Sequence, residues 1–83
     1  MYRVTAVHPL DGYRLAVEFE DGLRGEIDLA DRLFGPVFEP LRDLAVFRAV
    51  SIDKFGVICW PTGADLAPDA LHSTLAAGQR VAP

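Results

Sequence analysis

The side chains with the most obvious chemical potential are one cysteine and two histidines. Cys59 paired with His8 or His72 would supply a nucleophile and its base. Cys59, however, lies in the apolar run 57–60, and a buried cysteine usually behaves as a small hydrophobic residue. A single cysteine with two separated histidines also lacks the ligand spacing of a zinc site. The sequence therefore predicts no catalytic residue, no metal site and no cofactor.

Two aspartates four residues apart, Asp65 and Asp69, are the other chemical candidates. They could act as paired carboxylates in acid–base work or bind a hard cation. Both also stand at a predicted helix start, where capping and the helix dipole favour acids. We interpret them as structural and expect Asp65→Ala to cost about 0.5–2 kcal/mol, the range for a lost cap. Asp65→Asn should cost less, because Asn still accepts those hydrogen bonds.

The alternative hypothesis is a small ligand-binding protein or enzyme. Its pocket would lie near Trp60, Asp65, Asp69 and His72. Trp60 itself has two interpretations. It is either a core side chain whose N–H meets a backbone carbonyl, or an aromatic anchor for a partner. Mutual proximity of the four side chains in a concave site would support the pocket.

The stretch 57–71 holds these residues and predicts a buried strand, a rigid turn and a helix start. Pro61 has no N–H for a sheet ladder, so the strand should end there. Gly63 is free to adopt positive φ in the turn. Pro68 suits the first turn of a helix over residues 68–77, with Leu71 on its buried face and Gly78 as its C-terminal stop.

A hairpin is the clearest element ahead of this stretch. Residues 13–20 alternate apolar and polar side chains, which is typical of a strand with one buried face. Asp21-Gly22 then predicts a two-residue primed turn, which would place Glu20 beside Leu23 and Phe19 beside Arg24. Residues 23–28 form the returning strand, and residues 2–7 form a first strand that completes an antiparallel meander.

Between the hairpin and the stretch 57–71, Asp28 is expected to cap a short turn over residues 29–33. Asp43 is expected to cap a helix over residues 44–50. Phe34, Val37 and Phe38 lie in an irregular proline-bracketed loop, so they either pack beneath it or form a partner surface. Strands are predicted over 51–55 and 57–60. The chain is thus one α+β domain over residues 1–83, of order β-β-β-α-β-β-α, with an antiparallel or mixed sheet and helices packed on one face.

Composition narrows the function classes. Eight basic and twelve acidic residues give a net charge of −4, which disfavours direct nucleic-acid binding. The sequence shows no signal peptide and no membrane-spanning apolar run, and its single cysteine fits a reducing compartment, so we expect a cytoplasmic protein. A domain this small that is 51% hydrophobic should leave apolar surface that a monomer cannot bury, which predicts a homodimer that buries this surface between two copies.

The run W-P-T-G-A-D-L-A-P-D-A-L, from Trp60 through Pro61, Gly63, Asp65, Leu66, Pro68 and Asp69 to Leu71, resembles the signature of the domain of unknown function 2442 family. Residues 38–43 with Phe47, and the hairpin ending in Asp21-Gly22, resemble it too. The resemblance implies the same fold and a bacterial protein often encoded beside another small protein, as toxin–antitoxin pairs are. We therefore expect a non-enzymatic protein-interaction domain, antitoxin-like or accessory, whose partner is the neighbouring gene product. Family members often carry Tyr where this chain has His72.

Overall fold

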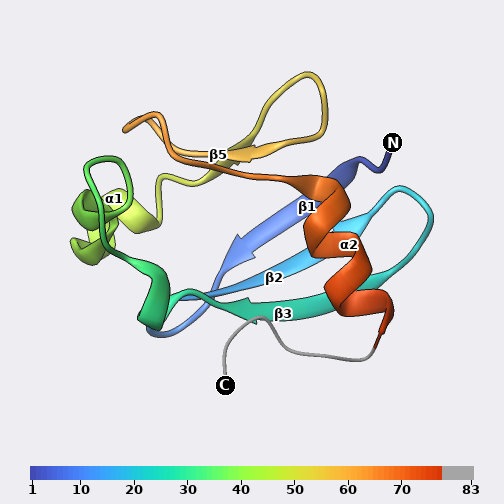
Figure 1. Cartoon of the computed structure of the whole chain (residues 1–83), viewed down its shortest axis with the longest axis horizontal. Helices are drawn as coiled ribbons and strands as arrows, with labels where there is room; N and C mark the ends of the chain where they lie inside the picture. The colour runs from blue at the N-terminus through green and yellow to red at the C-terminus, as the bar shows by residue number, and fades with distance from the viewer. Residues whose placement is uncertain (78–83) are drawn as a thin grey trace.

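The computed structural model describes residues 1–77 as two three-stranded antiparallel sheets with two α-helices (Figure 1). This confirms the α+β class. The first sheet has the order β1-β2-β3 and the second β4-β5-β6. In chain order the elements are β1 (Val4–Pro9), β2 (Arg14–Phe19), β3 (Arg24–Asp28), η1 (Ala30–Arg32), η2 (Glu39–Arg42), α1 (Leu44–Phe47), β4 (Ser51–Ile52), β5 (Ile58–Cys59), β6 (Asp65–Leu66) and α2 (Pro68–Ala76), where η marks a 3₁₀ helix.

The predicted period-two strand is β2. Its inward residues Leu15 and Val17 are buried, whereas Ala16 and Glu18 on the other face are half-exposed. The alternation follows from the strand pleat, which sends successive side chains to opposite faces. The β1–β2–β3 sheet therefore has one face toward the core and one toward solvent.

The β2–β3 loop differs from the prediction by one residue. Phe19 N–H donates to the Leu23 carbonyl at 2.8 Å, and Gly22 N–H donates to the Phe19 carbonyl at 2.9 Å, so residues 20–22 form a longer loop. The predicted two-residue turn is wrong because its primed form needs positive φ at both central residues. Gly22 has φ 93°, but Asp21 does not. The resulting register sets Phe19 opposite Leu23 and Val17 opposite Gly25, so the apolar face stays continuous.

The second sheet uses the same loop twice. In the β5–β6 loop, the Trp60 N–H donates to the Ala64 carbonyl at 3.0 Å and the Gly63 N–H donates to the Trp60 carbonyl at 3.1 Å. In the β4–β5 loop, the Asp53 N–H donates to the Val57 carbonyl and the Gly56 N–H donates to the Asp53 carbonyl, both at 3.0 Å. Gly63 and Gly56 have φ 96° and 77°, which glycine adopts without strain. The prediction that Gly63 reverses the chain after Pro61 is thus confirmed. The residues that follow Gly63 form β6, a strand that the sequence did not predict.

Two other predicted elements are shorter than expected. Asp43 Oδ1 accepts the N–H of Ala45 at 3.0 Å and caps α1 as predicted, but the α-helical part ends at Phe47. The predicted strand over 51–55 stops at Ile52, because Asp53 Oδ1 accepts the N–H groups of Phe55 and Val57 and folds the chain into a turn. Asp28 also caps the following turn as predicted, by accepting the Ala30 N–H at 2.9 Å.

Helix α2 covers the inner face of the β1–β2–β3 sheet, whereas α1 lies at one end of the molecule (Figure 1). Gly25 allows this close approach: a Cβ atom there would lie 2.6 Å from Leu75 Cδ2 on α2. The predicted C-terminal stop at Gly78 lies outside the described residues. The largest fully buried side chains belong to one core cluster that joins the two sheets and the helices: Leu15, Phe19, Ile27, Leu29, Leu33, Leu41, Phe47 and Ile58.

Candidate functional site

Trp60 anchors the motif stretch in the core. Its side chain is 4% exposed, and its Nε1–H donates to the Phe47 carbonyl at 2.8 Å. The ring contacts Phe47 and Phe38, with centroids 6.0 and 6.4 Å apart. The bonded N–H and the low exposure settle the question left open by the sequence, because a buried tryptophan with a satisfied donor is a packing residue.

The loop after Trp60 is tied to the proline-bracketed loop. Thr62 Oγ1 donates to the Val37 carbonyl at 2.9 Å, and it lies 3.4 Å from the Ala64 N–H. Leu71, farther along the motif, is buried on α2, and Pro68 occupies the first turn of that helix. The motif is therefore a continuous piece of the structural frame from the core to the helix.

The structure contradicts the predicted capping role of Asp65. Its side chain is exposed on β6, opposite Cys59, and accepts no hydrogen bond from residues 1–77. The N-cap of α2 is Ala67, which has no side-chain cap. The prediction is wrong because the Gly63 N–H donates to the Trp60 carbonyl at 3.1 Å and the Ala64 N–H lies 3.4 Å from Thr62 Oγ1, so the turn does not use the carboxylate. Thr62, rather than Asp65, serves the turn.

Asp69 and His72 instead hold the N-terminus. Asp69 Oδ1 accepts the Tyr2 N–H at 3.0 Å, and the Tyr2 ring stacks on the His72 imidazole with centroids 3.5 Å apart and planes 7° from parallel. Phe19 meets the same imidazole edge-on at 5.0 Å. His72 is 9% exposed, so these rings enclose it almost completely.

The enclosed imidazole is paired with the β2–β3 loop. His72 Nε2 lies 2.6 Å from Asp21 Oδ2, while Asp21 Oδ1 accepts the Leu23 N–H at 3.1 Å. An ionised carboxylate only accepts hydrogen bonds, so Nε2 must carry the proton. The Leu23 N–H, followed by the bond from His72, lowers the pKa of Asp21 below its ordinary value of 3.8. We call Tyr2, Asp21, Asp69 and His72 the polar latch.

The four residues of the ligand-pocket alternative do not converge. Asp69 and His72 belong to the polar latch, Trp60 packs between Phe47 and Phe38, and Asp65 faces solvent. The reactive residues are also separate. Cys59 Sγ lies 3.6 Å from Ser51 Oγ, and His8 is exposed on β1. Within residues 1–77, no group of three or more His, Cys, Asp or Glu side chains is placed to hold a metal ion.

The proline-bracketed loop divides its three apolar residues between core and solvent. Phe38 packs against the core, whereas Phe34 and Val37 are 67% and 39% exposed. Phe34 stands beside an open hollow with a volume of about 430 Å³. We call this feature the apolar hollow; it is lined by Leu29, Arg32, Phe34, Phe38 and Leu66.

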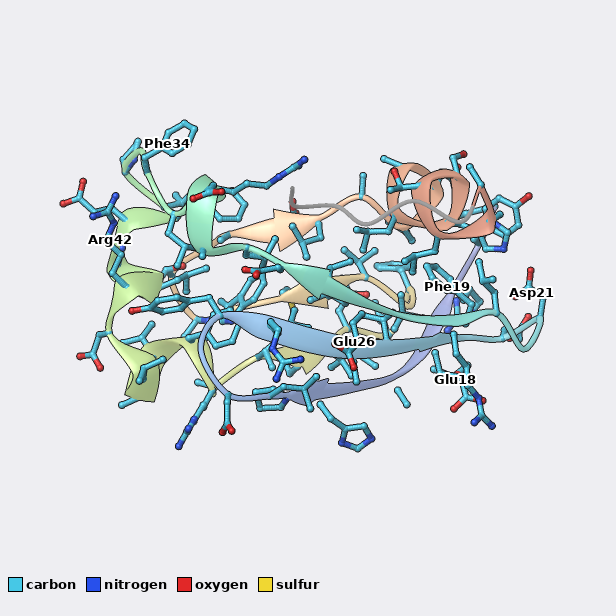
Figure 2. The ribbon with its side chains drawn as sticks, turned by 90° about the horizontal axis from the view of Figure 1, so that it is seen from below. Glu18, Phe19, Asp21, Glu26, Phe34 and Arg42 are labelled. Carbon is cyan, nitrogen blue, oxygen red and sulfur yellow. The ribbon has the colours of Figure 1, made fainter. Side chains whose placement is uncertain are left out.

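The two features lie at opposite ends of the molecule, as the positions of Phe34 and Asp21 in Figure 2 show. The sequence singled out the aromatic residues of the apolar hollow. It did not point to Asp21 and Tyr2 as partners of His72. These contacts join residues 51 or more positions apart, and no local pattern marks them.

Comparison with known proteins gives one match. The model of a family described as a protein of unknown function, DUF2442, matches residues 4–74. No curated protein and no solved structure matches the chain. No helix within residues 1–77 is long and apolar enough to cross a membrane.

Proposed function

The chain belongs to the DUF2442 family of unknown function, and for it we propose a role as a non-enzymatic protein-interaction domain. The observation that carries the proposal is the exposure of Phe34 beside the apolar hollow. An aromatic ring in water costs free energy that burial against a partner recovers, at roughly 25 cal/mol per Å² of apolar surface. Aromatic side chains are also common anchors of protein interfaces.

The loop that presents Phe34 is held on several sides. Arg42 Nε donates to the Leu33 carbonyl at 2.6 Å, and the Tyr13 hydroxyl donates to the Arg42 carbonyl. Thr62 adds its bond to the Val37 carbonyl at 2.9 Å. A loop fixed in this way loses little conformational entropy when a partner binds, and such preorganisation strengthens binding.

We further propose that the partner is a protein encoded next to this chain, with this chain as the antitoxin-like or accessory member of the pair. The net charge of −4 favours a partner of opposite charge. The exposed apolar residues also keep a homodimer as a second candidate assembly, which sedimentation of the purified chain at micromolar concentration would reveal.

The test measures binding of the neighbouring gene product to wild type, Phe34→Ala and Phe55→Ala. Phe55 is the matched control, because its ring is 59% exposed but lies in the β4–β5 loop and does not line the hollow. Phe34→Ala should weaken binding by about 2 kcal/mol or more, as expected for a hot-spot aromatic. Phe55→Ala should bind like wild type. Equal affinity of all three proteins, or no binding, would show that this surface does not bind the neighbouring gene product.

A further inference from the structure

Strand β6 forms an outer edge of the second sheet. The alternation of its hydrogen-bonded and non-hydrogen-bonded pairs with β5 shows which of its backbone groups face outward. Trp60 N–H donates to the Ala64 carbonyl at 3.0 Å, so these two residues form a hydrogen-bonded pair. Hydrogen-bonded and non-hydrogen-bonded pairs alternate along an antiparallel ladder. The next pair, Cys59 and Asp65, is therefore non-hydrogen-bonded. The N–H and C=O of Asp65 point away from β5, toward the outer edge of the sheet, where no described strand pairs with β6.

Side chains at this edge alternate between two surfaces. Leu66 lines the apolar hollow, and Asp65, on the opposite face of the strand, is exposed. The edge thus offers a backbone donor and acceptor, a carboxylate on one face and an apolar hollow on the other. An added strand can use all three at once, through the recognition mode in which a peptide extends a sheet.

We propose that β6 receives an extended segment of a partner protein that alternates basic and bulky apolar residues. The segment pairs antiparallel to β6, so the residue opposite Asp65 exchanges both backbone hydrogen bonds with Asp65. That residue also presents a basic side chain to the Asp65 carboxylate. Its neighbours point to the Leu66 face, where an apolar side chain enters the hollow beside Phe34. This inference rests on the proposed function and names the chemistry of the partner.

The other sheet edges are less suited to this role. By the same alternation, β3 turns the backbone groups of Arg24, Glu26 and Asp28 outward, but the side chains of Arg24 and Glu26 are already paired with Glu18 and Arg14 on β2. The β4 side of the second sheet lies against β1, where Val4 N–H donates to the Gly56 carbonyl at 2.9 Å. Strand β6 combines outward backbone groups with a carboxylate that has no partner among the described residues and with the apolar hollow, whereas the hollow beside β3 is bordered by the charged Arg24 and Glu26.

The test uses a synthetic peptide that alternates lysine and leucine, with affinity measured by fluorescence anisotropy. Methylating the lysine backbone nitrogens removes the donors that would face Asp65, and should weaken binding about tenfold or more. Methylating the leucine nitrogens, which would point away from β6, is the matched control and should leave the affinity unchanged. A peptide with glutamate in place of lysine should bind more weakly than the lysine peptide.

Protein variants locate the binding site. Asp65→Lys should weaken the lysine peptide about threefold to tenfold, with Asp11→Lys, another exposed aspartate, as the neutral control. Phe34→Ala should weaken it about tenfold or more, and Phe55→Ala should not. The amide resonances of Asp65 and Leu66 should shift on binding.

Three results would overturn the proposal. The first is absence of binding by the lysine peptide, and the second is equal weakening by the two methylation patterns. The third is a purified dimer that Asp65→Lys dissociates, because a second copy would then occupy the edge. If the neighbouring gene product still binds in a Phe34-dependent manner in these cases, the interaction function stands and only the strand-addition mode fails.

Discussion

The polar latch and the apolar hollow differ in whether their side chains already have partners within the chain. In the latch, the two oxygens of Asp21 accept from Leu23 and His72, Asp69 accepts from Tyr2, and the rings of Tyr2 and Phe19 enclose the imidazole. At the hollow, Phe34 keeps most of its ring in water although the loop behind it is well bonded.

This difference separates stability from recognition. Within residues 1–77, no buried side-chain nitrogen or oxygen lacks a hydrogen-bond partner, so the latch leaves no buried polar atom for an incoming molecule to satisfy. The hollow offers apolar surface whose burial is still available. We therefore expect substitutions in the latch to lower stability and substitutions at the hollow to lower binding.

The largest effect on stability should come from His72→Ala. The change removes a hydrogen bond to a charged group and leaves the enclosing rings around a cavity. We expect a loss of about 1.5–3 kcal/mol in the free energy of unfolding, as for hydrogen bonds to charged groups. Denaturant titration measures it, with exposed Ser73→Ala on the same helix as the control. A loss no larger than that of the control would show that the latch does not stabilise the fold.

A smaller effect should appear as a pH dependence. The pKa of Asp21 is lowered in the folded chain by the Leu23 N–H and by His72, so the folded state favours the carboxylate. The stabilisation is fully present above the unfolded pKa near 3.8 and is lost as pH falls through the lower folded pKa. Melting curves from pH 6 down to about pH 2 should therefore converge for wild type and Asp21→Asn. A constant difference between them would contradict the assignment.

The smallest effect on stability should come from Asp65. Its exposed side chain makes no hydrogen bond or ion pair within the described residues, so Asp65→Ala and Asp65→Asn should each change the free energy of unfolding by less than about 0.5 kcal/mol. This reverses the expectation drawn from the sequence. If thermal melting shows Asp65→Ala to be destabilised by the cost of a lost cap while Asp65→Asn is not, the carboxylate does serve the turn.

The sequence by itself determined the features that depend on neighbouring residues. The alternation in 13–20 predicted β2 and its buried face, Pro68 marked the start of α2, and Asp28 and Asp43 predicted their own caps. Each feature arises from steric or hydrogen-bond preferences within a few positions along the chain. Such preferences leave a pattern that can be recognised before any tertiary contact is known.

Only the tertiary structure decided the loop register, the strand β6 and the two end features. The extra residue in the β2–β3 loop keeps the apolar face continuous between Phe19 and Leu23, a cross-strand requirement that the Asp21-Gly22 pair does not encode. The local sequence around Asp65 is typical of a cap, but the Trp60 carbonyl and the Thr62 hydroxyl serve the N–H groups of Gly63 and Ala64 instead. His72 contacts Asp21 because α2 packs on the sheet at the place where Gly25 leaves room for Leu75. These outcomes follow from which distant surfaces bury each other, and local sequence carries little record of that choice.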